Sequence, residues 1–404
     1  MNSLKIEIYI RIFVLMLFVV APKVSKGETK ALSDDPNFIQ ASLLITSQGD
    51  LPHQIFGHAT LRMECPTHNF DRVFSFNNNT SDDYFKMLTS ESLGMIQEGE
   101  TKDYINETRE EGRQLVSYPL NLTLDQKARL WEVLDSLKTT PERPFNAFGD
   151  HCFSVAAEAL QIAISPDYID WNEPTFQKNT YGNLLRLSEN GTYPWNYVLL
   201  NLSFGTKEEL KGVWKEYVYP TIFEKEYNQF YIYSPNGTKK PLISGSPKIL
   251  LNLKEEQKPN RPTPIETSLI VLAITLMVTV FQYLRKGRIA GAVLDWTFWI
   301  FITALGVAIA LLTFSSRLET TGWNWLLIIF NPIAWIPIFI YRKNYATLKK
   351  IWIFYAAVLV IFATFINFLA PSIDISFRIF AISLAVRCIW HVINRINPEQ
   401  SKMH

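Results

Sequence analysis

The chain has 404 residues and a formal net charge of +1 at pH 7. A charge balance so close to zero gives no sign of a nucleic-acid partner, and we expect none. Apolar residues are concentrated after residue 264. This distribution excludes a uniformly soluble chain and predicts one soluble domain followed by a membrane domain.

The first 27 residues have the pattern of a secretory signal peptide. Lys5 and Arg11 precede an apolar run at residues 12–20, and the small residues Ser25 and Gly27 follow. The small residues make only a moderate cleavage site, so an uncleaved membrane anchor stays open as an alternative. Either arrangement exports the segment that follows, which we expect to form a soluble domain over residues 28–264.

Three strands are expected near the start of this domain, at residues 41–47, 54–63 and 70–76. The second strand alternates, with His58, Thr60 and Arg62 on one face. If the loop between the second and third strands is centred near residues 66 and 67, Ser75 lies opposite His58 and Asn77 lies diagonal to it. These two polar side chains are therefore the groups expected to orient the imidazole.

The rest of the soluble domain is predicted from hydrophobic periodicity and turn residues. Residues 195–204 form an apolar helix that either packs on the core or dips into a bilayer surface. A charged, proline-rich linker follows at residues 254–264. The remaining predictions are helices at residues 82–88 and 124–137, strands at 114–122, 230–233 and 249–253, and an irregular loop at 165–182.

Cys152 begins a run of strong helix formers in which Val155, Ala159 and Ala163 recur at helical spacing. Asp150 occupies the position expected for the N-cap. Free N–H groups and the helix dipole in the first turn favour an anion, and they can lower a thiol pKa to roughly 3.5–7.5. The sequence thus indicates a nucleophile, while a small buried core residue is the structural alternative.

The membrane domain is expected to contain five spans. Basic residues follow the first span and separate the third from the fourth. The positive-inside rule therefore places these two loops in the cytoplasm, and with it the C-terminal tail of residues 394–404. The soluble domain then lies outside, as the signal peptide also predicts. The five expected spans are residues 265–284, 290–314, 323–341, 351–370 and 375–393, with Pro332 and Pro337 kinking the third.

Three cysteines are present: Cys65, Cys152 and Cys388. Cys388 falls within a span and is expected to be a packing residue. In an oxidising compartment, a Cys65–Cys152 disulfide is the main alternative to a reactive thiol. The histidine and acidic residues show no metal-ligand spacing, so neither a metal nor another cofactor is predicted.

Several motifs resemble those of the Lnb-type family of bacterial membrane proteins. Residues 47–62 are similar to its glycine-rich approach and "F-G-H-x-x-L-R" strand, and residues 149–152 are similar to its "D-N-C-[ST]" motif. The resemblance extends from about residue 40 to 393, including a "D-x-V-Y-N-Y"-like strand at residues 71–76 and later segments at 193–205 and 314–332. Ser75 and His151 replace asparagines of the family pattern, which affects the third catalytic residue and leaves His58 and Cys152 in place.

The resemblance implies an α+β fold: a papain-like, circularly permuted NlpC-type periplasmic domain followed by a five-helix transmembrane α-bundle. It also implies a lipoprotein N-acyltransferase of the bacterial inner membrane. Such an enzyme takes an acyl chain from a phospholipid and delivers it to the N-terminal amine of a lipidated lipoprotein. Cys152 would carry the acyl group as a thioester, and His58 would transfer protons.

Two other functions remain open at this stage. An NlpC-type cell-wall amidase or peptidase would use the same Cys152–His58 pair with a polar, peptide-sized cleft. A membrane scaffold would instead be held together by a Cys65–Cys152 disulfide. Arg317 and Arg378 fall at the predicted outer membrane surface, where they either bind a lipid phosphate or serve as ordinary interfacial anchors.

Overall fold

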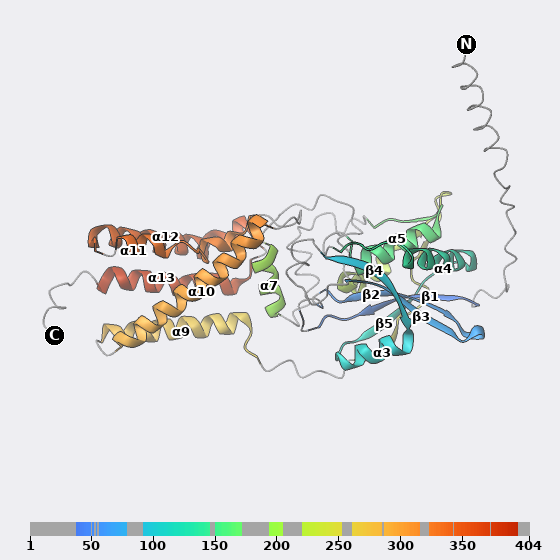
Figure 1. Cartoon of the computed structure of the whole chain (residues 1–404), viewed down its shortest axis with the longest axis horizontal. Coiled ribbons are helices and arrows are strands. Elements are labelled where there is room, and N and C mark those ends of the chain that lie inside the picture. Colours follow the sequence, from blue (N-terminus) through green and yellow to red (C-terminus); the bar gives the residue numbers. More distant parts are fainter. Residues whose placement is uncertain are drawn as a thin grey trace, which may run out of the picture.

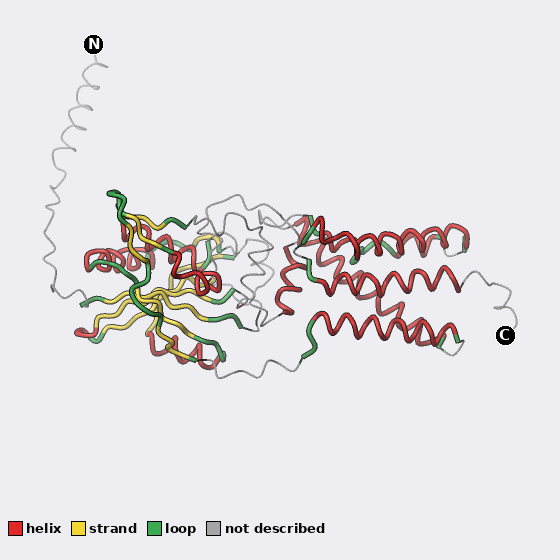
Figure 2. The backbone as a smooth tube through the Cα atoms, turned by 180° about the vertical axis from the view of Figure 1, so that it is seen from behind, coloured by secondary structure: helices red, strands yellow, loops and turns green. Residues whose placement is uncertain are grey.

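The structure is a computed structural model that describes residues 38–394 with gaps at 50, 52–53, 55, 79–91, 146–149, 172–193, 205–219, 253–260, 285–286, 316–322, 342 and 372. The predicted signal peptide, the predicted helix 82–88 and Arg317 lie outside the described residues. The molecule is elongated: a sheet domain occupies one end and a group of long helices the other (Figures 1 and 2).

An antiparallel sheet of seven strands forms the centre of the first domain, in the order β10-β5-β1-β2-β3-β4-β6. The predicted strands at residues 41–47, 70–76, 114–122 and 249–253 are confirmed within it, whereas the strand predicted at 54–63 begins only at His58. A second, smaller sheet has the order β7-β8-β9 and contains the predicted strand at 230–233. The strands are β1 (Gln40–Thr46), β2 (His58–Cys65), β3 (Phe70–Asn78), β4 (Leu93–Glu100), β5 (Leu115–Pro119), β6 (Arg143–Pro144), β7 (Tyr168–Ile169), β8 (Tyr231–Tyr233), β9 (Lys239–Pro241) and β10 (Lys248–Leu251).

The register of the β2–β3 hairpin differs from the expected one. Leu61 pairs with Phe74, which places Ser75 opposite Thr60. The predicted pairing of Ser75 with His58 was therefore wrong. A short 3-10 turn at Pro66–His68, closed by Asn69 at φ 51°, moves the centre of the loop along the chain. Because side chains alternate along a strand, His58 and Ser75 still share one face of the sheet.

Helices cover both faces of this sheet (Figure 1). The face that carries Ala59 and Leu61 packs against α4 (Leu124–Lys138) and α5 (Cys152–Ile164). The opposite face packs through Leu44 and Val73 against Tyr104 of α3 (Thr101–Glu110). Neither α3 nor β4 was predicted, because their sequences are too polar to show a continuous apolar period.

Among the described residues, four helices are long and apolar enough to cross a membrane: α9 (Pro264–Tyr283), α10 (Arg288–Ser315), α12 (Tyr345–Leu369) and α13 (Ile375–Asn394). The predicted third span at residues 323–341 is not a continuous helix. It contains a 3-10 turn at Trp325–Ile328 (η5), an irregular stretch at Asn331–Pro332, and the six-residue helix α11 (Trp335–Ile340). Proline lacks the N–H that a helix interior needs, so this apolar segment breaks instead of kinking.

The broken segment nevertheless traverses the group of helices. Asn324, at its start, bonds to the end of α7 (Pro194–Phe204), which adjoins the sheet domain. Its far end leads into α12, and that helix returns over 25 residues to Asp374, which also bonds to α7. The chain therefore passes five times along the domain, four times as a continuous helix.

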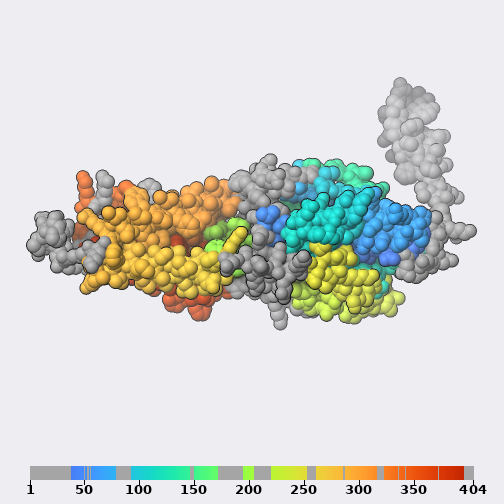
Figure 3. Space-filling model, turned by 90° about the horizontal axis from the view of Figure 1, so that it is seen from below, coloured from blue at the N-terminus to red at the C-terminus, as the bar shows by residue number. Residues whose placement is uncertain are grey.

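Helix α7 joins the two halves of the molecule. Tyr197 and Leu200 are buried in the core of the sheet domain, whereas Val198 is buried in the core of the membrane helices. Its green surface lies at the junction of the two halves (Figure 3). The apolar helix predicted at residues 195–204 is thus confirmed, and it packs on both cores.

Candidate functional site

Cys152 is the first residue of α5, as the sequence predicts. The N-cap is His151, not Asp150: the backbone N–H of Phe153 donates to His151 Nδ1 over 3.3 Å, and Ser154 Oγ accepts the N–H of His151 over 2.8 Å. Asp150 instead lies 3.3 Å from the guanidinium of Arg143. His151 therefore caps the helix at the position where the motif it resembles has an asparagine.

The thiol environment is less favourable to a thiolate than its helix position suggests. Burial raises the pKa of Cys152 to about 11. Backbone amides of Ala59 and Phe153 and the charge of Arg113 act in the opposite direction but do not outweigh burial. The expectation of a lowered pKa was therefore wrong for this state of the protein, because the helix terminus is buried and not solvated. A thiol held in this way needs a base to react at neutral pH.

His58 begins β2 and belongs to a line of polar side chains. Its Nε2 lies 2.5 Å from Ser75 Oγ, and Ser75 Oγ donates to Asn77 Oδ1 over 2.8 Å. Asn77 Nδ2 in turn donates to Gln97 Oε1 of β4 over 2.8 Å. Ser75 and Asn77 thus share the face of His58, although not in the predicted register, and the chain of bonds fixes which way the ring points.

Gly57 shapes the backbone just before His58. It has φ +75°, and a Cβ at this position would lie 2.6 Å from the carbonyl oxygen of Thr46. Only glycine fits such a close approach without moving the neighbouring strand. The position of the imidazole therefore depends on this glycine as well as on its hydrogen bonds.

The thiol and the imidazole meet β2 at consecutive residues. The sulfur of Cys152 lies at the backbone amide of Ala59, and Ala59 follows His58 directly. Successive side chains leave a strand on opposite faces. The His58 side chain therefore lies on the α3 face of the sheet, whereas the Cys152 sulfur approaches from the α5 face. Both lie at the N-terminal end of β2.

A polar cavity of about 470 Å³ opens beside His58 on the α3 face. His58, Ser75 and Asn77 form part of its wall, and Cys152 is not among the described residues of that wall. The wall contains further polar residues that sequence reasoning did not identify, among them Gln97, Tyr104 and Arg113. Only the pairing of β4 with β3 and the packing of α3 bring them to this face.

Arg113 and Tyr104 connect the cavity to the thiol. Arg113 is buried, its Nε donates to the carbonyl oxygen of Ser47 over 2.8 Å, and its charge favours the thiolate of Cys152. Tyr104 OH lies 2.6 Å from Thr46 Oγ1. Burial raises the pKa of Tyr104, although its hydrogen bonds with Thr46 and Thr60 act to lower it. The neutral phenol of Tyr104 and the guanidinium of Arg113 therefore lie at the end of β1, next to Cys152 and His58.

All three cysteines are free, which contradicts the Cys65–Cys152 disulfide. Cys65 ends β2, whereas the Cys152 thiol lies at Ala59, six residues earlier in the same strand. That length of strand is about 20 Å, while a disulfide requires Cα atoms within about 7 Å. Cys388 is buried among the membrane helices, as expected of a packing residue.

Two other candidates have structural partners. Arg378 lies in the first turn of α13 and donates from Nε to the carbonyl oxygen of Ala363 over 2.7 Å. Asp71 accepts two bonds of 2.7 Å from Arg62. Burial acts to raise the pKa of Asp71, but the bonds from Arg62 and Thr101 lower it on balance. In the described parts of the chain, no three His, Cys, Asp or Glu side chains gather as a metal site.

Two family models match the chain. Residues 29–185 match the Lnb N-terminal periplasmic domain, and residues 254–398 match the Lnb transmembrane domain. The first match contains His58 and Cys152, and the second contains all four long helices. No curated protein and no solved structure matches the chain.

Proposed function

Because this chain belongs to the Lnb family of membrane proteins with a periplasmic domain, we propose that it is a thiol-dependent acyltransferase. The acyl donor is a phospholipid and the acceptor is the N-terminal amine of a lipidated lipoprotein cysteine, as the sequence resemblance implies. One observation carries this proposal: the Cys152 thiol, at the start of a helix, lies at the backbone amide of Ala59, the residue that follows His58 in the strand.

In the first half of the reaction, His58 removes the proton of Cys152 and the sulfur attacks the ester carbonyl. The S–C bond forms and the C–O bond breaks, and the imidazolium gives its proton to the leaving lysophospholipid oxygen. Backbone amides in the first turn of α5 stabilise the negative charge on the carbonyl oxygen. Since burial raises the pKa of Cys152, the base is essential to this step.

In the second half, the lipoprotein amine attacks the thioester. The N–C bond forms, the C–S bond breaks, and the amine proton returns through His58 to the sulfur. Ser75 and Asn77 keep the ring oriented, since Ser75 Oγ bonds to Nε2 and Asn77 bonds to Ser75. The step requires the imidazole to reach the sulfur around the end of β2, where the amide of Ala59, the residue after His58, lies at the thiol.

Contacts of α7 support a substrate that lies in the bilayer. Asn196 Nδ2 donates to the carbonyl oxygen of Gly49, in the loop that leads to His58. Asn201, further along the same helix, accepts the N–H of Asp374 at the start of α13 through its Oδ1. The reactive edge of the sheet is thus connected through one helix to the membrane domain. This contact suits a donor whose chains are too apolar to leave the membrane.

The arrangement of basic residues supports an exported soluble domain. Arg288, Lys343 and Lys349 lie at the end of the membrane domain opposite α7. We infer that this end is cytoplasmic, under the positive-inside rule, and that the protein is a multi-pass protein of the bacterial inner membrane. Residues 1–27 then act as the signal peptide. Arg378, near the opposite end, is a candidate for contact with a lipid phosphate. Arg317, which lies outside the described residues, is the second candidate from the sequence.

An NlpC-type amidase is the second candidate, and the polar cavity beside His58 favours it. A peptide would fit the 470 Å³ of polar space. An amidase would use the same Cys152–His58 pair, but its reaction does not require a membrane domain. The acyltransferase accounts for the membrane domain as well, and we place the amidase second.

The deciding experiment is a mass spectrometric analysis of lipoprotein N-termini from cells with and without the gene. Acyl transfer predicts that N-acylated cysteine disappears when the gene is deleted and returns with the wild-type gene. An unchanged N-terminal lipid profile, together with altered cell-wall peptides, would establish the amidase instead.

A further inference from the structure

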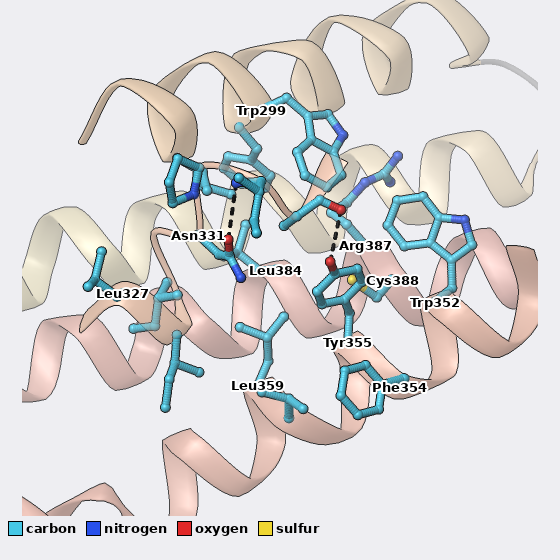
Figure 4. A pocket seen from close by; sticks show the side chains of 18 of the residues that line it. Trp299, Leu327, Asn331, Trp352, Phe354, Tyr355, Leu359, Leu384, Arg387 and Cys388 are labelled. Atoms are coloured by element: carbon cyan, nitrogen blue, oxygen red, sulfur yellow. Dashed lines mark hydrogen bonds between the residues drawn. The ribbon is translucent and has the colours of Figure 1, made fainter. Parts of the chain in front are cut away.

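The membrane domain contains an apolar cavity of about 530 Å³. It lies between α10, α12, α13 and the broken segment at residues 323–341. The side chains of Tyr355, Leu359, Leu384 and Cys388 point into it from α12 and α13 (Figure 4). A space of this size inside a helical domain is large enough for a ligand.

The break in the third crossing creates this space. Gly306 of α10 has no side chain, and a Cβ there would lie 2.3 Å from the carbonyl oxygen of Phe330, so the broken segment rests directly on α10. Tyr355 OH donates to the carbonyl oxygen of Ala334 over 2.9 Å and holds the other side of the segment on α12. Two short helical pieces fill less volume than a straight helix would, and fixed contacts keep the cavity open.

The two ends of the cavity differ. Phe314 and Trp323, which are 72% and 53% exposed, line the end nearest α7. Asp295, Arg387 and His391 line the opposite end. Arg387 is twelve residues after Ile375, which places it about 18 Å along α13 at 1.5 Å per residue. One leaflet of hydrocarbon is about 15 Å thick, so the cavity extends through at least the outer leaflet.

The charged end is satisfied by its own partners. Arg387 donates from Nε and Nη2 to the two carboxylate oxygens of Asp295 over 2.7 and 2.9 Å. Its Nη1 donates to Thr279 and Gln282 of α9 over 2.9 and 2.8 Å. Both edges of the guanidinium are therefore engaged, which makes this cluster a poor site for a phosphate. It closes the cavity with a polar floor.

The part of the cavity next to the Asp295–Arg387 cluster also faces the surrounding lipid. A second cavity of about 720 Å³ shares Asp295, Trp299, Trp352 and His391 with the first. It opens along α10 past Trp296 and Ile300, which are 60% and 66% exposed on the outer face of the helix. Hydrocarbon chains of the bilayer are thus the apolar molecules that meet this part of the protein.

We infer that the membrane domain binds one acyl chain of a membrane lipid in this cavity, with its methyl end at Arg387 and its ester end near Phe314 and Trp323. The role of this site rests on the proposed acyl transfer. A bound chain holds its ester at the end of the membrane domain that adjoins α7, next to the edge of the sheet that carries His58. The polar floor limits how deep a chain can extend, so it also sets an upper limit on chain length.

The test uses the full-length Cys152→Ala protein in vesicles of phosphatidylglycerol and phosphatidylethanolamine. A fraction of the phosphatidylethanolamine carries a photoreactive diazirine at the methyl end of its acyl chain. After illumination, labelled residues are identified by mass spectrometry. We expect the label on Leu384 and Cys388. In Leu359→Trp, which fills the middle of the cavity, labelling of these two residues should fall at least tenfold. Val360 is the next residue of α12 and faces the lipid, so Val360→Trp should leave the labelling unchanged.

Label confined to outward-facing residues such as Ile361 and Phe365 would overturn the inference, as would equal loss in Leu359→Trp and Val360→Trp. If Leu359→Trp does not fold, Ala310→Phe narrows the same cavity from α10, and the unsubstituted label map decides the question without any cavity variant. Because Cys152→Ala has no nucleophile, labelling is independent of catalysis. A labelled cavity in a protein that leaves lipoprotein N-termini unchanged would refute the proposed function and keep the lipid site.

Discussion

His58 Nε2 lies 2.5 Å from Ser75 Oγ, although the strand register places Ser75 opposite Thr60 and not opposite His58. The contact is diagonal across two strands and continues to Asn77 and Gln97. A serine hydroxyl therefore stands where the related motif has an asparagine, and Asn77 is placed behind it.

We expect Ser75→Ala to lower the rate of acyl transfer by roughly ten- to a hundredfold, because the ring loses the partner that orients it. Asn77→Ala should have a smaller effect, since Asn77 acts through Ser75. Steady-state rates with both variants test this order. Ser75→Thr keeps the hydroxyl and serves as the control. Wild-type rates in both alanine variants would mean that another group orients His58.

Cys152→Ser and His58→Ala should each abolish transfer while membrane insertion stays normal. A hydroxyl keeps the shape of the thiol but is a far weaker nucleophile, and without the imidazole a thiol of raised pKa stays protonated. Activity is measured in cells that lack the chromosomal gene, with protein levels in the membrane fraction as the control. Cys65→Ala should remain active. Full transfer by either of the first two variants would refute the catalytic pair.

The pH dependence of thiol alkylation should reveal the burial of Cys152. Because its pKa is raised to about 11, the thiolate fraction grows about tenfold per pH unit up to that value and not only up to the ordinary value near 9. The alkylation rate with iodoacetamide should therefore keep rising above pH 9. Mass spectrometry follows Cys152 separately from Cys65 and Cys388. A rate that levels off below pH 8 would show instead that the helix terminus dominates over burial.

Gly57→Ala should reduce activity and stability together. The substitution forces a Cβ to 2.6 Å from the Thr46 carbonyl and costs about 1–2 kcal/mol for the left-handed backbone alone. Both effects shift His58, which follows directly. Thermal unfolding and transfer rate are the measurements. Gly237→Ala is the matched control: this glycine has φ +84° but nothing within 4 Å of its Cβ position, so it should lower stability without affecting transfer.

Asn324→Ala should weaken the joint between the two halves. Asn324 is buried and donates from Nδ2 to the carbonyl oxygens of Asn201 and Leu202 over 3.0 and 3.1 Å. Its removal leaves two carbonyls at the end of α7 without this donor, at a cost of about 1–3 kcal/mol. We expect transfer between membrane-embedded substrates to fall while alkylation of Cys152 is unchanged. Asn344→Ala, which removes only the N-cap bond from the N–H of Thr347 at the start of α12, should leave transfer near the wild-type rate.

His151→Asn should preserve activity, because asparagine is a better N-cap than histidine and matches the related motif. His151→Ala removes the acceptor for the N–H of Phe153 and should lower the free energy of unfolding by about 1 kcal/mol. Unfolding of the two variants, compared with the wild type, measures this difference. A collapse of activity in His151→Asn alone would indicate that His151 has a role beyond capping.

Hydrophobic patterning in the sequence was sufficient to predict the two-part organisation, the strands around His58, the helix that starts at Cys152 and four of the long membrane helices. These features depend on periods of two or 3.6 residues within one segment, and such periods are visible without knowledge of the fold. The shared face of His58, Ser75 and Asn77 follows from the same alternation along neighbouring strands.

Only the tertiary structure determined the remaining features of the site. The register of the hairpin depends on a three-residue turn, and β4 and α3 have too few apolar residues to be recognised before they pack on β3. Gln97 and Tyr104 come from these segments and Arg113 from the turn after α3, so their approach to His58 has no local signal. The pKa of Cys152 depends on burial by the whole domain, and the break in the third crossing depends on how Gly306 and Tyr355 hold an apolar segment that composition alone assigns to a helix. Local periodicity determines which segments fold, whereas solvation and contacts between segments determine what the assembled side chains can do.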